Sequence, residues 1–576
     1  MTDLCLLSLV FVAPLAGALL LLLIPERFER IIRALALGFS AIPMAVGIGL
    51  FWQAASVHRG GFLLRDSISL SPSLGLSFHL GADGLSATLL FLSGVISMVA
   101  ILASFGITKQ VRGYFSLLLV LFAGMNGVFV ALDMVLFYVF WELMLIPMFF
   151  LIAIWGGEQR RYASMKFFFY TMAGSIMLLV VMLTLHIKTP IDGLTVSLSR
   201  TAVLSEMSVD REGNARVQDL AVTVLDSSGD ISRASASAIV QGKGQVFQVH
   251  VPRDFNLLHW RLLWKHWTTQ SFLGMNLAVF AFLFFFLAFA VKVPVFPLHT
   301  WLPHAHVQAP TAVSVVLAGV LLKLGVYGFL RIAWPLFPTV AAAFGGWIGV
   351  LGVIAIVWAA LAALGQKDLK RLVAYSSVSH MGFCLLGLAA LTVSGITGSM
   401  FQMFSHGIGA ALLFLLVGVL YDRAHHRRVD GFGGLAATMP AFTAVLMLAA
   451  FSSIGLPSMS GFVGELTVIL GSFQSRAGVF AGWSPDTFRW LGLVAATGVI
   501  LSAAYLLWTV QRVAFGPLRH PEQGQYPDLT LREKFSLYPL VALTLLFGIW
   551  PQPLLSALGP WAQGLSQHVA SALGAL

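Results

Sequence analysis

Apolar segments of membrane length follow one another along most of this 576-residue chain. Each is about 20 residues long, which is the length at which an α-helix crosses the hydrocarbon core of a bilayer. Helices are expected there, because a helix satisfies its own backbone hydrogen bonds where no water is present. The sequence therefore predicts an all-α polytopic membrane protein with about 14 transmembrane helices, near residues 4–24, 31–52, 84–107, 114–131, 134–154, 164–186, 270–291, 310–333, 340–364, 372–392, 398–421, 439–475, 490–511 and 536–553.

The composition supports a membrane protein and argues against a soluble one. Hydrophobic residues make up 58% of the chain and charged residues 10%, whereas about a quarter of the residues in a soluble domain are charged. The net charge of +10 is attributed to cytoplasmic loops and not to nucleic-acid binding. Cys5 and Cys384 lie in apolar segments and predict neither a metal site nor a disulfide. The run 6–24 lacks a basic leader, so a first spanning helix is expected there, not a cleaved signal.

The distribution of basic residues among the connections predicts the orientation. Lys and Arg gather in alternate loops, and these are cytoplasmic by the positive-inside rule. Both termini then lie outside, as an even number of spans requires. The polar segment 188–268 also falls outside. Its stretches 221–225 and 245–251 alternate like strands, which favours a small β-rich external insert, with a disordered loop as the alternative.

Several ionisable side chains fall within the apolar segments or at their broken ends, and six of them are candidates for a site. A charged group near the bilayer centre costs at least about 2.5–3.5 kcal/mol, so such residues mark functional sites. Buried carboxyl and amino groups respond to nearby charge, and imidazole titrates near neutrality. The alternative is a polar contact between helices or a lysine that reaches the interface. We predict a proton relay made of Glu142, Lys292, Lys323, His380, His406 and Glu465.

Two apolar segments are interrupted, one in each half of the chain. Prolines break 290–310 just after Lys292, and the sequence IGLPSMSG breaks 439–475 just before Glu465. Paired interruptions are typical of transporters built from inverted repeats. We therefore expect N-terminal helices at 1–113, a first repeat at 114–333 that contains the insert, a second, inverted repeat at 340–511, and a last helix with a tail at 512–576.

The histidines of the first break could suggest a metal centre. His299, His304 and His306 lie in a proline-rich connection without further ligand residues, which favours a role in shaping the break. The chain has no phosphate-binding glycine loop and no cysteine set for an iron–sulfur cluster. No cofactor is therefore expected in this chain.

The motifs around the ionisable residues resemble a known family. FWELMLIPM at 140–148, KVPVFPLHTWLP at 292–303 and APTAVS at 309–314 are similar to the antiporter-like subunits of respiratory complex I. The similarity extends over nearly all of the chain except 188–268. Glu465, where the other branches usually carry lysine, favours the M-type branch. His304 replaces the usual aspartate, and Val313 replaces the usual glycine.

The resemblance implies a proton-translocating subunit of a proton-pumping NADH:quinone oxidoreductase in the bacterial inner membrane, beside the L-type and N-type subunits. FMN, Fe–S clusters and quinone would be held by partner subunits. The implied coupling pair is Glu142 and Lys292, with Lys323 at the centre and Glu465 at the end of the relay. The alternatives are an Mrp-type Na⁺/H⁺ antiporter subunit, a membrane-bound hydrogenase subunit, and a purely structural membrane scaffold.

Overall fold

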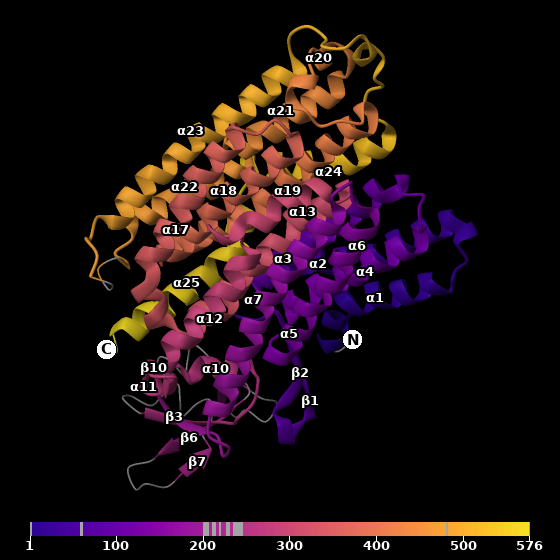
Figure 1. Cartoon of the computed structure of the whole chain (residues 1–576). Coiled ribbons are helices and arrows are strands. Elements are labelled where there is room, and N and C mark those ends of the chain that lie inside the picture. The colour runs from indigo at the N-terminus through magenta and orange to yellow at the C-terminus, as the bar shows by residue number, and fades with distance from the viewer. Residues whose placement is uncertain are drawn as a thin grey trace.

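Long helices packed side by side make up most of the molecule, and a small β-structured part lies at one end (Figure 1). The computed structural model describes residues 3–57, 61–199, 207–209, 215–217, 220–225, 231–233, 246–477, 479 and 482–574. Both ends of the described chain lie toward the end of the bundle that carries the strands (Figure 1).

The first half of the bundle contains the helices up to the second expected repeat. They are α1 (Asp3–Leu23), α2 (Glu29–Val57), α3 (Gly84–Ala103), α4 (Val111–Val130), α5 (Met134–Leu143), α6 (Leu145–Trp155), α7 (Arg160–Lys188), α10 (Leu257–Leu262), α11 (Trp264–Thr269), α12 (Leu277–Lys292), α13 (Trp301–Gln308), α14 (Thr311–Val316), α15 (Leu322–Gly328) and α16 (Trp334–Leu336). Two π-helical turns, η5 (Leu317–Leu321) and η6 (Phe329–Ala333), join α14 to α15 and α15 to α16.

The second half contains the remaining helices and is closed by a bent C-terminal pair. They are α17 (Pro338–Leu364), α18 (Leu369–Ala389), α19 (Val393–Ala424), α20 (Leu435–Thr438), α21 (Pro440–Ile454), α22 (Ser460–Gln474), α23 (Thr487–Ala514), α24 (Leu531–Ile549) and α25 (Gln552–Gly574). The chain turns by 69° between α24 and α25. Helix α25 then packs against α2, α3, α17 and α19.

The predicted fold class is confirmed. Within the described residues, 11 helical segments are long and apolar enough to cross a membrane, and the α24–α25 pair brings the number to 12. The segments expected at 270–291 and 439–475 are shorter because each meets a break, α12 after 16 residues and α21 after 15. These two helices are apolar but too short to be counted among the 11 to 12, so the observed number is roughly consistent with the predicted 14.

Strands gather at one end of the bundle. β1 (Leu64–Ser71) and β2 (Leu76–Ala82) form an antiparallel hairpin. The insert contributes a six-stranded antiparallel sheet in the order β3-β8-β6-β5-β4, with β7 paired to β6. Its members are β3 (Leu194–Ser199), β4 (Met207–Val209), β5 (Ala215–Val217), β6 (Leu220–Leu225), β7 (Ile231–Arg233) and β8 (Val246–Val251). The two stretches that alternate in the sequence fall on β6 and β8.

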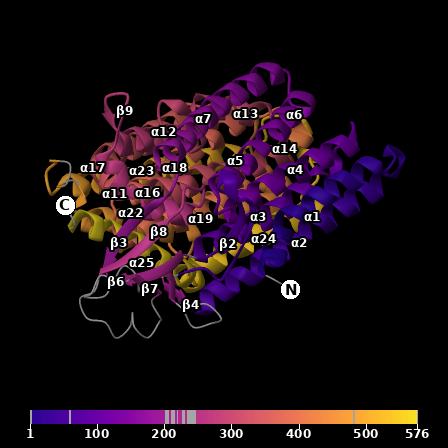
Figure 2. The ribbon, with the colours of Figure 1, turned by 90° about the horizontal axis from the view of Figure 1, so that it is seen from below.

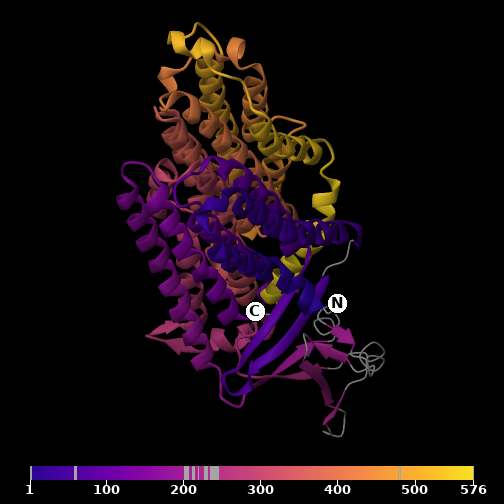
Figure 3. The same ribbon diagram turned by 90° about the vertical axis from the view of Figure 1, so that its right-hand side faces the viewer.

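The hairpin and the insert lie at the same end of the molecule (Figure 3). Seen from that end, the strands of the insert lie in front of the helices (Figure 2). A short hairpin of β9 (Ser271–Phe272) and β10 (Met275–Asn276) leads from the insert into α12. The return of the insert is hydrogen-bonded to the start of α5, since Met134 N–H donates to Phe255 O and Leu257 N–H donates to Leu132 O.

Polar side chains close the first turns of several helices. The first amides of a helix lack partners within it, and a capping side chain supplies one. Asp83 caps α3 by accepting from Ser86 N–H, and Asp133 caps α5 by accepting from Val135 and Leu136 N–H. These caps fix where the apolar helices begin, and both lie at the hairpin end of the bundle.

The break between α21 and α22 is held by a close approach of α24. Gly455 ends α21 with φ +77°, a conformation that glycine adopts at little cost. Gly548 of α24 packs against the break, and a Cβ atom built there would lie 2.2 Å from Ser458 O. Only a glycine at this position lets α24 contact the backbone of the break directly.

We expect Gly548→Ala to destabilise the protein by about 1–3 kcal/mol, because the added methyl group meets backbone that cannot rotate away. Gly559→Ala on α25 is the matched control, since its Cβ would meet nothing within 4 Å, and a helical Gly→Ala change should be neutral or slightly stabilising. The measurement is thermal unfolding of the detergent-solubilised protein. Equal Tm values for the two variants would contradict this account of the break.

Candidate functional site

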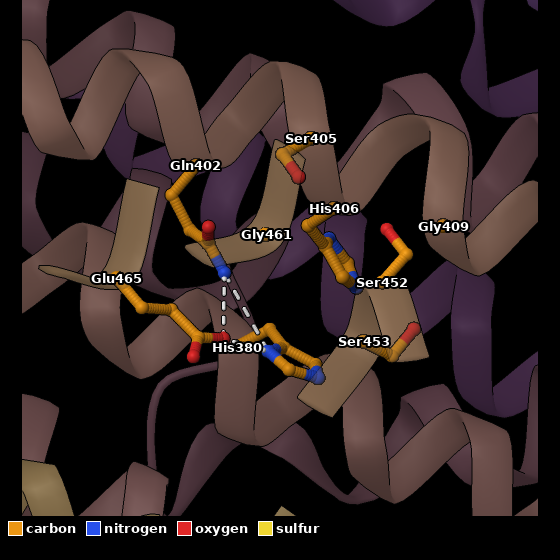
Figure 4. Close-up of a pocket in the computed structure, with 9 residues that line it drawn as sticks. All are labelled: His380, Gln402, Ser405, His406, Gly409, Ser452, Ser453, Gly461 and Glu465. Atoms are coloured by element: carbon orange, nitrogen blue, oxygen red, sulfur yellow. Dashed lines mark hydrogen bonds and ion pairs between the residues drawn. The ribbon is translucent and has the colours of Figure 1, made fainter. Parts of the chain in front are cut away.

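Four of the six predicted residues form one line that runs from the last crossing of the first half into the second half of the bundle. They come from three neighbouring crossings and from the broken helix, with Lys323 on α15, His406 on α19, His380 on α18 and Glu465 on α22. All four side chains are buried. Figure 4 shows the part of this line around His380 and Glu465.

Lys323 begins the line and is fully buried. Its Nζ donates to Ala318 O at 2.5 Å and to His406 Nδ1 at 2.9 Å. Ala318 belongs to η5, where the wider π turn directs Leu322 N–H to Leu317 O. Such turns occur often at functional sites. The ammonium is therefore held by two neutral acceptors, and His406 must present an unprotonated Nδ1 to it.

The two histidines continue the line toward Glu465. The rings of His406 and His380 have centroids 5.5 Å apart and planes inclined by 32°. His380 Nδ1 donates to Glu465 Oε1 at 2.9 Å. The pair is buried, with 5% and 4% of the two side chains exposed. Lysine, two imidazoles and a carboxyl group are thus connected across four helices.

Gln402 belongs to the same group and was not among the predicted residues. Its Nε2 donates to Glu465 Oε1 at 3.3 Å and lies 3.5 Å from His380 Nδ1 (Figure 4). Its position four residues before His406 places both side chains on one face of α19. This spacing is the feature of the sequence that could have indicated Gln402. Its side chain is an uncharged amide, however, so the cost of a charge in the membrane does not mark it.

A small cavity adjoins this group. It measures about 10 Å³ and is lined by the two histidines, Gln402, Glu465 and the hydroxyl groups of Ser405, Ser452 and Ser453, with Gly409 and Gly461. Within the described part of the chain, His380 Nε2, His406 Nε2, Gln402 Oε1 and Glu465 Oε2 are buried without a hydrogen-bond partner. A cavity of this size and polarity can hold about one water molecule. The group therefore has the capacity to bind a bridging proton carrier.

Glu142 and Lys292 lie in the first half of the bundle. Glu142 is next to the end of α5, and Pro147, which has no N–H, follows at the start of α6. Lys292 is buried at the end of α12, and its Nζ lies 4.8 Å from the centre of the Trp141 ring. Among the described residues no ion pair joins Glu142 to Lys292, and Glu142 Oε1 is buried without a hydrogen-bond partner. The Trp141 ring, next to Glu142 in the sequence, is thus the aromatic neighbour of the Lys292 amine.

The three histidines near the first break point in different directions. The His299 ring packs 4.7 Å from the Trp358 ring, and the His306 ring stacks 4.3 Å from the Phe414 ring. His304 Nδ1 donates to Thr300 O at 2.8 Å. The described residues contain no group of three or more His, Cys, Asp or Glu side chains that could hold a metal ion.

A family model matches much of the chain. The model is described as NADH:quinone oxidoreductase/Mrp antiporter, TM, and it matches residues 131–209 and 255–485. The gap between the two matched ranges falls in the insert.

Two curated relatives match over almost their whole length. NADH-quinone oxidoreductase subunit M of Rhodobacter capsulatus is 38% identical over 575 residues, which cover 99% of this chain and 98% of the relative. NAD(P)H-quinone oxidoreductase chain 4 2 of Thermosynechococcus vestitus is 34% identical over 577 residues, which cover 99% and 93%.

Solved structures agree with the fold. A chain of respiratory complex I from Thermus thermophilus superposes with a TM-score of 0.75 at 27% identity, over 98% of this chain and 99% of that chain. A chain of the Mrp complex from Dietzia sp. DQ12-45-1b gives a TM-score of 0.74 at 21% identity, over 99% and 100%. The second similarity, at this identity, concerns the fold alone.

Proposed function

The chain belongs to the NADH:quinone oxidoreductase/Mrp antiporter family of membrane proteins, and we propose that it is the M-type, proton-translocating subunit of a proton-pumping NADH:quinone oxidoreductase. The observation that carries the proposal is the buried line from Lys323 through His406 and His380 to Glu465. Full-length similarity to subunit M of Rhodobacter capsulatus supports the choice of branch.

Proton transfer along this line follows from the hydrogen bonds. Lys323 Nζ gives a proton to His406 Nδ1 across 2.9 Å, and His406 then releases a proton from Nε2, the nitrogen on the other side of the ring. Nε2 is buried without a partner in the described structure, and His406 borders the small cavity. From there the proton reaches His380, and His380 Nδ1 delivers it to Glu465 Oε1. Because imidazole accepts on one nitrogen while it donates from the other, it suits both middle positions.

Glu142 and Lys292, in the first half of the bundle, couple proton transfer to changes in the neighbouring subunit. A change in the charge of Glu142 alters the electrostatic potential at Lys292, since Coulomb interactions are strong in a low-dielectric interior. The ring of Trp141, the residue before Glu142, lies against the Lys292 amine. Lys292 ends α12 at the break, where the polarised helix end and the unwound backbone can stabilise a moving charge.

The division into two inverted repeats is part of the proposal. Each of the ranges 114–333 and 340–511 contains five crossings, and the fourth is interrupted in both. An odd number of crossings gives the second range the opposite orientation in the membrane. The crossings are α4, α5–α6, α7, α12–α13 and α14–α16 in the first range, and α17, α18, α19, α21–α22 and α23 in the second.

The partners and the orientation follow from the same function. Redox chemistry belongs to partner subunits that hold FMN, Fe–S clusters and quinone, and the membrane neighbours are the L-type and N-type subunits. The chain is a multi-pass protein of a bacterial respiratory membrane. The basic loops face the cytoplasm, whereas the termini and the insert face outside.

An Mrp-type antiporter subunit is the second candidate, because the family model that matches the chain also covers Mrp antiporters. The two candidates differ in the source of energy. Proton movement in vesicles that contain the purified complex should respond to NADH and quinone, and it should not respond to an imposed sodium gradient. The reverse result would establish the antiporter.

Glu142→Gln and Lys323→Ala should each lower NADH-driven proton pumping at least about tenfold, which is about 1.4 kcal/mol, while the complex still assembles. The first change removes the coupling charge and the second removes the central proton carrier. The measurement is the pH change in proteoliposomes, normalised to the amount of assembled complex. Glu158→Gln is the matched control, because Glu158 lies exposed in the connection between α6 and α7. Normal pumping in either test variant would refute the relay.

Gln402→Leu should slow coupled quinone reduction by about tenfold, because a hydrogen bond to a charged group contributes about 1.5–3 kcal/mol. The substitution keeps the volume but removes the amide that donates to Glu465 Oε1. Gln474→Leu on α22 is the control, since Gln474 is exposed and bonds to Ser394. Gln402→Asn should recover part of the rate if the amide matters. Equal rates for the Leu variants at 402 and 474 would remove Gln402 from the site.

A further inference from the structure

A buried ion pair lies at the end of the crossing that carries Lys323. Arg331 Nη1 donates to Asp83 Oδ2 at 2.6 Å, and Arg331 Nη2 donates to Asp83 Oδ1 at 2.8 Å. Only 8% of the arginine side chain and 5% of the aspartate side chain are exposed. The residues are 248 positions apart in the sequence, and the proposed relay uses neither of them.

The pair lies between Lys323 and the hairpin end of the bundle. Lys323, Tyr327 and Arg331 follow one another at intervals of four residues, so they occupy one side of the helix. Arg331 Nε donates to Tyr327 Oη at 3.2 Å, and Tyr327 Oη donates to Phe129 O at 2.9 Å. Asp83 directly follows β2, which lies at the end where the hairpin meets the insert (Figure 3).

Aromatic rings and α25 cover the pair. The Arg331 guanidinium carbon lies 5.4 Å from the centre of the Tyr327 ring, and 5.9 Å from the centres of the Phe62 and Trp561 rings. Helix α25 reaches the backbone beside Asp83, since a Cβ atom built at Gly84 would lie 1.9 Å from Ala557 O. The pair is therefore enclosed by side chains and backbone, in line with its low exposure.

Neither member of the pair can carry a proton. A guanidinium group stays protonated in proteins. Burial raises the pKa of the Asp83 carboxyl, but the charge and the hydrogen bonds of Arg331 outweigh that effect and hold the pKa below its usual range. Both carboxylate oxygens are already occupied, because Oδ1 also accepts from Ser86 N–H. The pair therefore offers no group that a proton could use as a step between Lys323 and the outer end of the helix.

We propose that the Asp83–Arg331 pair is a proton seal, which closes the direct route from Lys323 to the outer end of its own crossing. Protons on Lys323 then leave only toward His406, and the transported proton must pass Glu465. The inference rests on the proposed function of Lys323 as a proton carrier. A purely structural role, in which the pair only ties α3 to η6, is the alternative that the experiment distinguishes.

The test is the passive proton leak of the whole complex in proteoliposomes, under an imposed pH gradient and without NADH. The double variant Asp83→Asn/Arg331→Gln removes both charges together, so that neither is left buried and unpaired. We expect its leak to rise several-fold over that of the wild type, while quinone reduction continues and NADH-driven acidification falls. A wild-type leak in the assembled double variant would overturn the seal.

A matched control uses a second ion pair of the same geometry. Arg423 at the end of α19 donates to both oxygens of Glu533 on α24, at 3.0 and 2.9 Å, and 7% and 11% of these side chains are exposed. Arg423→Gln/Glu533→Gln should leave the leak unchanged, because this pair is not on the helix of Lys323. An equal leak in both double variants would mean that any lost ion pair loosens the bundle, which would overturn the seal.

Two further variants separate this proposal from the function of Lys323. Adding Lys323→Ala to the leaking double variant should return the leak to the wild-type value. If the leak persists, its protons do not come from Lys323 and the seal is overturned, whereas the proposed function is tested separately by NADH-driven pumping in Lys323→Ala alone. If the double variant does not assemble, Trp561→Ser opens the cover without touching the pair. This variant should leak, and an unchanged leak would overturn the proposal.

Discussion

The cost of placing an ammonium group in a low-dielectric interior determines much of this structure. Lys323 is fully buried, and its hydrogen-bond partners, a backbone carbonyl and an imidazole, are both neutral. A buried charge without a counter-ion is expensive, so the charge at this position depends on its neighbours. The π turn that supplies the carbonyl, the histidines of α18 and α19 and the broken helix of Glu465 are all arranged around this one amine.

Two kinds of buried polar network result, and they differ in how completely their atoms are paired. The ion pairs Asp83–Arg331 and Arg423–Glu533 are bidentate. They connect helices and hold them in place. The group around His380 and Glu465 instead leaves several buried atoms without partners in the described structure and borders a cavity. A fully satisfied network is rigid, whereas a partly satisfied one can rearrange its protons. The degree of pairing thus separates the ion pairs that hold the helices together from the group that is proposed to carry protons.

The fold class and four residues of the buried line were predictable because they depend on local features of the chain. The length of the apolar segments predicts the membrane crossings, and an ionisable residue inside a crossing indicates a candidate site. The rest depends on contacts between distant segments. In the sequence, Gln402 is an ordinary amide and Asp83 is a loop residue. Only the folded structure places Glu465 next to Gln402 and Arg331 next to Asp83. The absence of a Glu142–Lys292 ion pair in the described structure, and the position of Trp141, also depend on the angle between α5 and α12, which residue spacing does not determine.

The insert bears on the proposed coupling pair through the starts of α5 and α12. The segment that follows β8 is hydrogen-bonded to the start of α5, and in the short hairpin after the insert Gln270 O accepts from Leu277 N–H at the start of α12. Glu142 and Lys292 lie at the opposite ends of these two helices. A helix is stiff along its axis, with a rise of about 1.5 Å per residue, so restraining both starts limits how far the two ends can slide. A change in the interaction between Glu142 and Lys292 must therefore come from side-chain rotation and from the unwound backbone next to each residue, which is where Pro147 and the break after Lys292 lie.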